Sequence, residues 1–171
     1  MMRLAFVLLL LISLPLLQSS VRRQAPEQVA PACPAPNLVA SNWPYVSNRG
    51  FSLRIPPGYR QTEERGDMFV GRFEAGDSGA MGFDYGQYSA MRLVAQGMRS
   101  EASSCWDTIA GMPVFVVSWV GDSTFHGYTG YCAGGSWHHQ RSGRPSLNLS
   151  GCATSVEGQR KILAALRTVE F

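Results

Sequence analysis

The chain has 171 residues and a formal net charge of +3, from 15 Lys and Arg against 12 Asp and Glu. This length corresponds to one ordinary domain. The basic residues are dispersed along the sequence, and no block of Lys and Arg indicates a nucleic-acid-binding surface. We therefore expect no nucleic acid among the partners.

The first residues have the charge–apolar–polar order of a secretory signal. Arg3 precedes an apolar run over residues 4–17 that only Ser13 interrupts, and polar residues follow at 18–20. The run is shorter than the ~20 apolar residues that a spanning helix needs. We expect residues 1–20 to be a signal peptide, although the sequence does not fix the exact cleavage site. The mature protein is expected to be secreted or periplasmic without a membrane span. A persisting N-terminal anchor is the alternative.

Residues 21–42 are rich in Pro, Ala and Gln and have no apolar periodicity. This composition predicts a tail or linker. A single folded domain is expected over residues 43–171.

The first half of this domain predicts short strands. Alternating apolar and polar residues predict a strand at 50–55, which the turn Pro56-Pro57-Gly58 ends. A charged loop is expected at 60–67. Strands at 68–73 and 80–85 then form a hairpin around the turn at 76–79.

The second half predicts further strands between two helices. Residues 89–102 predict a helix, and the nearly continuous apolar stretch at 112–120 predicts a strand covered on both faces. Two strands follow, at 128–133 and 147–152. Thr154 begins a helix with capping-box spacing, and a short last strand is expected at 168–171. The predicted fold class is α+β, an antiparallel sheet with flanking helices.

The four cysteines, Cys33, Cys105, Cys132 and Cys152, are read as disulfides because an exported chain meets an oxidising compartment. Three connectivities are possible. A hairpin turn near residue 142 places Cys132 almost opposite Cys152, which favours this pair and leaves Cys33–Cys105 by elimination. A one-residue register slip would overturn the assignment.

Two short segments resemble PsbP/Mog1-like domains. Residues 51–59, Phe-Ser-Leu-Arg-Ile-Pro-Pro-Gly-Tyr, are similar to the opening strand and turn of that family, and residues 166–171 are similar to its closing helix-into-strand segment. The resemblance implies a PsbP/Mog1-like sandwich and an accessory or binding role. It supplies no catalytic residues.

Two groups of residues are candidate sites. Aromatic side chains can line a ligand surface or fill the core, and the middle of the chain holds Trp106, Trp119, Tyr128, Tyr131 and Trp137. The three histidines, His126, His138 and His139, suggest a weak metal site based on His126 and His138, with Asp122 or Asp107 as a further ligand. Solvated hairpin residues are the simpler interpretation of these histidines.

No acid–base or nucleophile constellation stands out in the sequence. We therefore expect a disulfide-stabilised, non-enzymatic binding or accessory protein of the cell envelope, without a cofactor. Its partner, an envelope protein or a small ligand, and its oligomeric state stay open. The alternatives are a metal-assisted hydrolase that uses the histidine region, and a purely structural envelope protein.

Overall fold

A computed structural model describes residues 32–35, 37–48, 50–65, 70–76, 78–86, 102–122, 129–137 and 145–171. The expected signal peptide and three histidines lie outside these ranges. The elements are β1 (Tyr45–Ser47), β2 (Ser52–Arg54), β3 (Arg60–Arg65), β4 (Val70–Glu74), β5 (Gly79–Gly86), β6 (Ser103–Ile109), β7 (Met112–Asp122), β8 (Thr129–Trp137), β9 (Ser146–Ala153) and α2 (Val156–Leu166).

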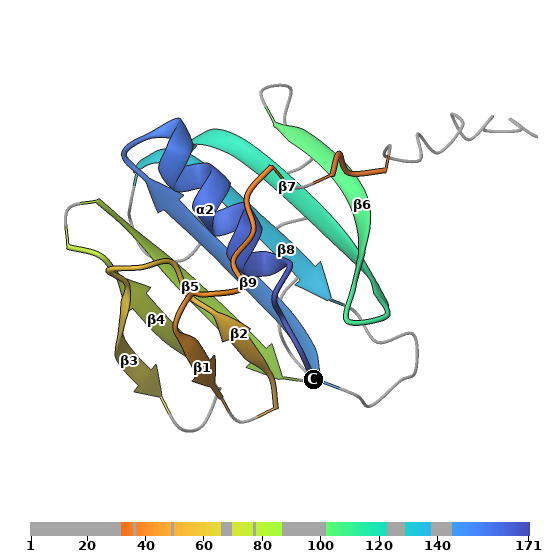
Figure 1. Ribbon diagram of the computed structural model, residues 1–171, viewed down its shortest axis with the longest axis horizontal. Coiled ribbons are helices and arrows are strands. Elements are labelled where there is room, and N and C mark those ends of the chain that lie inside the picture. Colours follow the sequence, from red (N-terminus) through yellow and green to blue (C-terminus); the bar gives the residue numbers. More distant parts are fainter. Residues whose placement is uncertain are drawn as a thin grey trace, which may run out of the picture.

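The core of the fold is a 7-stranded antiparallel sheet with the strand order β3-β4-β5-β9-β8-β7-β6. The helix α2 lies across β8 and β9, and the small β1–β2 sheet lies on the same side of the large sheet (Figure 1). Five of the six neighbouring pairs in this order are consecutive strands of the chain, and antiparallel neighbours of this kind need no crossover connection.

The expectation of an α+β fold with flanking helices is wrong. In the part of the chain that the structure describes, α2 is the only helix, and the protein is mostly β. The helix expected at 89–102 lies outside the described residues, except for Ala102, which directly precedes β6. The expected last strand is reduced to one antiparallel bridge between Ser52 and Glu170.

The strands that the sequence pattern missed include both edges of the large sheet. The charged segment expected to be a loop contains β3, and no strand was predicted at β6. An edge strand leaves one row of backbone N–H and C=O groups without a neighbouring strand, and it tolerates charged and polar side chains. Its pattern is therefore less apolar than that of an inner strand, which explains why both edges were missed.

The prediction for residues 112–120 is confirmed, because β7 is buried on both faces. Val114 and Val116 belong to the main core cluster, which fills the space between the large sheet, α2 and the β1–β2 sheet. Phe115 and Val117 alternate with them and belong to a second cluster on the opposite face, with Trp119, Cys132 and Cys152. Because successive side chains of β7 point to opposite faces of the sheet, this strand contributes to both hydrophobic clusters.

Disulfides join Cys33 to Cys105 and Cys132 to Cys152, the two pairs that the sequence favoured. Cys132 is the direct cross-strand partner of Cys152 in the β8–β9 register, as the predicted hairpin required. The first disulfide has a different role in the structure, because it attaches the segment before the domain to the edge strand β6.

Candidate functional site

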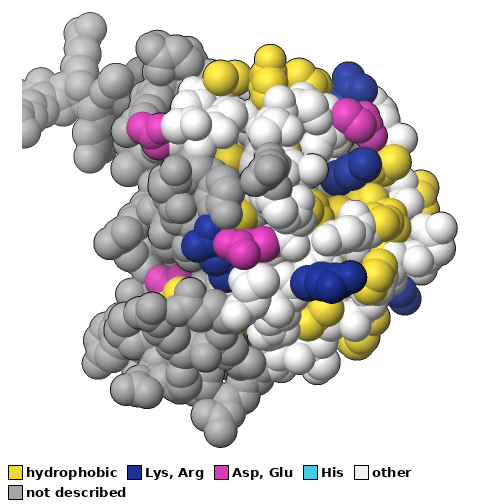
Figure 2. All heavy atoms as spheres, turned by 90° about the vertical axis from the view of Figure 1, so that its left-hand side faces the viewer, with side chains coloured by type: hydrophobic (Ala, Val, Ile, Leu, Met, Phe, Trp, Pro, Cys, Tyr) yellow, Lys and Arg dark blue, Asp and Glu magenta, His cyan; other side chains and the backbone are white. Residues whose placement is uncertain are grey.

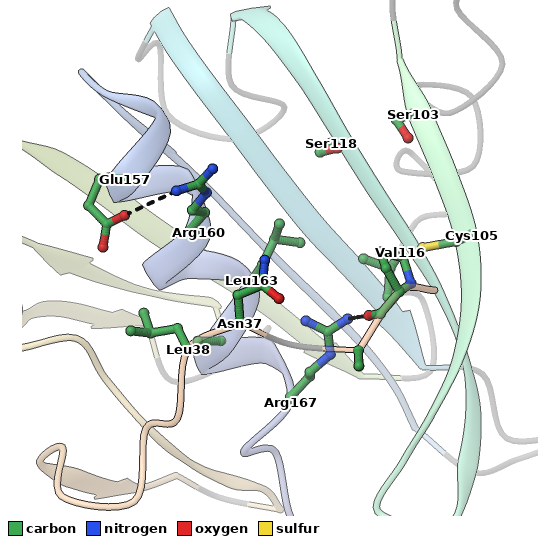
Figure 3. A pocket seen from close by; sticks show the side chains of 13 residues that line it. Asn37, Leu38, Ser103, Cys105, Val116, Ser118, Glu157, Arg160, Leu163 and Arg167 are labelled. Atoms are coloured by element: carbon green, nitrogen blue, oxygen red, sulfur yellow. Dashed lines mark hydrogen bonds and ion pairs between the residues drawn. The ribbon is translucent and has the colours of Figure 1, made fainter. Parts of the chain in front are cut away.

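A groove lies between α2, the β6–β7 hairpin and the N-terminal segment of residues 32–35 and 37–40, which we call the strap. Its volume is about 250 Å³. The three walls are shown in Figure 3. They consist of Pro34, Ala35, Asn37 and Leu38 from the strap, Ser103, Cys105, Val116 and Ser118 from the sheet, and Glu157, Arg160, Leu163, Ala164 and Arg167 from α2 and its C-cap.

The strap is attached to the domain by three kinds of bond. The disulfide joins Cys33 to Cys105. The backbone N–H of Cys33 donates to the carbonyl of Trp106 at 2.9 Å, next to a parallel bridge between Ala32 and Trp106. Nη2 of Arg167 donates to the carbonyl of Pro34 at 3.0 Å. This wall of the groove is therefore held by the protein's own bonds.

The helix wall is positioned by bonds at the start of α2. Ser155 is the N-cap, and its Oγ accepts a hydrogen bond from the backbone N–H of Gly158 at 3.1 Å. The cap is thus one residue later than the predicted Thr154. One turn on, Nε2 of Gln159 donates to the carbonyl of Cys132 at 2.7 Å. The first turns of the helix are therefore tied to the inner strand β8.

The sheet wall changes from polar to apolar along its length. Ser103 and Ser118 are cross-strand partners at one end, and Cys105 and Val116 are the next pair on the same face. Further along this face, Asp107 of β6 marks the other end of the groove.

The helix wall follows the same order. Gln159 also donates to the carbonyl of Trp119 at 3.3 Å, which places this turn beside the end of the sheet wall that holds the two serines. Arg160 follows Gln159, Leu163 lies one turn later, and Arg167 reaches Asp107 at the far end. In Figure 3 the groove runs from Arg160 and the two serines at one end, past Leu163, Asn37 and Val116, to Arg167 at the other. The ion pair of Arg167 with Asp107 closes this second end.

The two guanidinium groups differ in how firmly they are held. Nε of Arg167 lies 3.0 Å from Oδ2 of Asp107, and both side chains are mostly buried. Nη1 of Arg160 lies 3.7 Å from Oε2 of Glu157, and these side chains are 61% and 56% exposed. Exposed pairs of this kind contribute little, about 0–1 kcal/mol. Arg160 is thus the cation of the groove that is open to an added anion.

The aromatic residues proposed as a ligand surface do not share one face. Trp137 is fully buried in the main core, and Trp119 is buried in the second cluster on the opposite face. Trp106 is 42% exposed and packs edge-on against Phe115, with ring centroids 5.4 Å apart. Tyr131 is partly buried. Tyr128 lies outside the described residues.

The metal-site hypothesis falls mainly on residues that the structure does not describe, because His126, His138 and His139 lie outside it. Within the described ranges, no group of three or more His, Cys, Asp and Glu is placed to hold a metal ion. Asp107, a possible further ligand, forms the ion pair with Arg167.

Two tyrosines with shifted pKa values lie away from the groove. Burial raises the pKa of Tyr59 to about 12 and also raises the pKa of Tyr85. Neither residue lines the groove.

Sequence reasoning did not identify the groove, although part of its signal was present. Arg160, Leu163 and Arg167 follow the spacing of one helix face, so two cations flank an apolar residue at the border of the apolar stripe. The opposing serines gave no such signal, because only strand pairing brings Ser103 and Ser118 together.

On the face shown in Figure 2, Lys and Arg side chains lie apart from one another among acidic, polar and hydrophobic ones. In the part of the chain that the structure covers, no helix is long and apolar enough to cross a membrane.

No protein-family model and no curated protein matches the chain. A crystal structure from Bacteroides thetaiotaomicron VPI-5482, at 1.50 Å resolution, is similar with a TM-score of 0.46 and 13% sequence identity. The similarity covers 75% of this chain and 48% of that one, so the chain spans about half the length of this neighbour.

Proposed function

We propose that this protein is an exported, non-enzymatic binding or accessory protein of the cell envelope, and that the groove is its ligand site. Its two disulfides, Cys33–Cys105 and Cys132–Cys152, support export because such bonds persist in oxidising compartments. Fractionation of the native host is expected to recover the protein in the envelope or secreted fraction.

The tethered strap is the observation that carries the proposal. The Cys33–Cys105 disulfide and the hydrogen bond from Arg167 to Pro34 hold one wall against the other two. A wall ordered before binding does not have to be ordered by the ligand, which lowers the entropic cost of binding. The mixed lining, apolar with a few convergent polar groups, is typical of small-molecule sites.

The resemblance to PsbP/Mog1-like domains gives further support to an accessory role. The two segments that carry it are neighbours in the structure: the backbone N–H of Arg54 donates to Oγ1 of Thr168 at 2.8 Å, and Ser52 bridges to Glu170.

The proposal that the groove is the ligand site is tested by filling the groove with a bulky side chain at the edge strand β6. Ser103→Trp places a bulky side chain in the groove, and Thr108→Trp adds the same bulk to an exposed position on the opposite face of β6. Hexanol, hexanamide and hexanoate serve as probes in a titration followed by backbone NMR shifts. At least one probe is expected to shift residues around Val116 and Leu163 in the wild type and in Thr108→Trp, but not in Ser103→Trp.

Shifts that are the same in both tryptophan variants would contradict the groove as the ligand site. A folded, disulfide-intact protein that binds none of the probes would favour the purely structural alternative. Stoichiometric zinc or copper in the purified protein would favour the metal-assisted hydrolase.

A further inference from the structure

From the order of polar and apolar groups along the groove, we infer that its ligand is a small monocarboxylate with a short, unbranched apolar body. The inference rests on the proposed function, which places the ligand in this groove. It adds the charge of the ligand, its polarity and the direction in which it lies.

The carboxylate lies at the end formed by Arg160, Ser103 and Ser118. In the described part of the chain Arg160 pairs with Glu157 at 3.7 Å, so its guanidinium has donors left for an anion. The two serine hydroxyls come from the facing wall of the groove and add two more donors. A planar guanidinium matches a carboxylate in two parallel hydrogen bonds.

The charge of the second guanidinium is already paired within the protein. Arg167 bonds Asp107 through Nε and the Pro34 carbonyl through Nη2, both at 3.0 Å. The groove therefore binds one anionic group, at the end formed by Arg160. The lining holds two cations, Arg160 and Arg167, and one carboxylate, Glu157. Asp107 neutralises Arg167, so Arg160, whose exposed partner Glu157 lies 3.7 Å away, is the one cation left to attract an anion. A single cation suits a monoanion better than a phosphate or a dicarboxylate.

The apolar body lies along the middle of the groove. Leu163 and Ala164 of α2 and Val116 and Cys105 of the sheet line this part, and Asn37 of the strap lies beside Leu163 (Figure 3). The ion pair of Arg167 ends this apolar section. A volume of about 250 Å³ leaves room for a small ligand, and hexanoate is used as the probe of this size class.

The test compares hexanoate with hexanamide, which has the same shape but no charge. Calorimetric or NMR titration of the disulfide-intact protein is expected to give about tenfold tighter binding of hexanoate, as one charged hydrogen-bonded contact predicts. Arg160→Gln is expected to remove this preference, and Arg160→Lys to keep part of it. Lys161→Gln, which removes the same charge from the neighbouring residue outside the groove lining, is the matched control and keeps it.

Chain length supplies a second readout. From butyrate to hexanoate, each added methylene is expected to tighten binding about fourfold, because burying one methylene contributes about 0.8 kcal/mol to the free energy of binding. Acids longer than the groove are expected to gain no more.

Three outcomes would overturn the inference. They are equal binding of hexanoate and hexanamide, an equal loss in Arg160→Gln and Lys161→Gln, and no binding of hexanoate at millimolar concentration. If hexanamide or hexanol still binds and Ser103→Trp blocks it, the proposed function holds while the inference fails. If no probe responds to Ser103→Trp, both fail.

Discussion

Arg167 and Asp107 form an ion pair that joins the end of α2 to the edge strand β6, with Nε 3.0 Å from Oδ2. The same guanidinium donates to the Pro34 carbonyl of the strap. One side chain therefore connects three segments that are far apart in the sequence. A planar group with several donors in fixed directions is needed for this, because both acceptors must be reached at once.

Replacing Arg167 with lysine tests this connection without removing the charge. A lysine keeps a single ammonium and cannot reproduce the fork of donors, so Arg167→Lys is expected to lower the free energy of unfolding by about 1–2 kcal/mol. Urea unfolding measures the change. The exposed Arg160→Lys is the control and is expected to change stability by less than about 0.5 kcal/mol. Equal effects would show that the pair with Asp107 has no special structural role.

The two disulfides are expected to differ in their effect on the groove. Cys33→Ser with Cys105→Ser frees the strap, while Cys132→Ala with Cys152→Ala leaves it tethered. From sequence separations of 72 and 20, loop entropy predicts losses of about 4 and about 3 kcal/mol in unfolding free energy. Only the first pair of substitutions is expected to weaken hexanoate binding, by at least about tenfold. Binding that persists without the Cys33–Cys105 bond would show that the strap needs no covalent tether.

Gly158→Ala is expected to destabilise the protein, although alanine is the better helix former by about 1 kcal/mol. A Cβ at position 158 would overlap the Cβ of Ala153 in β9, so α2 would have to move away from the sheet. We expect a loss of about 1–3 kcal/mol, the usual effect of overpacking. Thermal unfolding measures it, and Ala153→Gly in the same chain should recover part of the loss. A stabilised Gly158→Ala variant would mean that the helix has room to adjust.

Stability is expected to fall at alkaline pH through Tyr59. Burial raises its pKa from 10.0 to about 12, so the folded state keeps the proton more firmly than the unfolded state. This contribution to the free energy of unfolding is present in full below pH ~10 and is lost as the pH rises toward ~12. At about 1.36 kcal/mol per pKa unit, the loss is at most about 2.7 kcal/mol. Tyr59→Phe should reduce the fall in unfolding free energy over this range. An unchanged alkaline slope in Tyr59→Phe would assign the effect to other groups.

Local patterns predicted the inner elements well. The apolar stretch of β7, the hairpin register that pairs Cys132 with Cys152, and the amphipathic helix α2 were all identified near their observed positions. Burial of one or both faces gives such segments a recognisable pattern of apolar residues along the sequence. The edge strands β3 and β6 were missed because solvent on one side removes that period.

The groove depends on contacts that no local pattern encodes. Ser103 meets Ser118 through strand pairing, and Arg167 meets Asp107 through the packing of α2 against the sheet. The aromatic residues show the converse, because the alternation of strands sends Trp119 and Trp137 into different cores.

The amino-acid pattern was sufficient for the pairing of the cysteines and the place of the final helix, since both depend on apolar periodicity and turn spacing over short stretches. The fold class and the site were settled by three-dimensional packing. A tail rich in proline becomes the wall of a groove because Cys33 is bonded to a strand that lies 72 residues further along the chain. Such long-range bonds depend on how distant segments meet, and local sequence carries little trace of that.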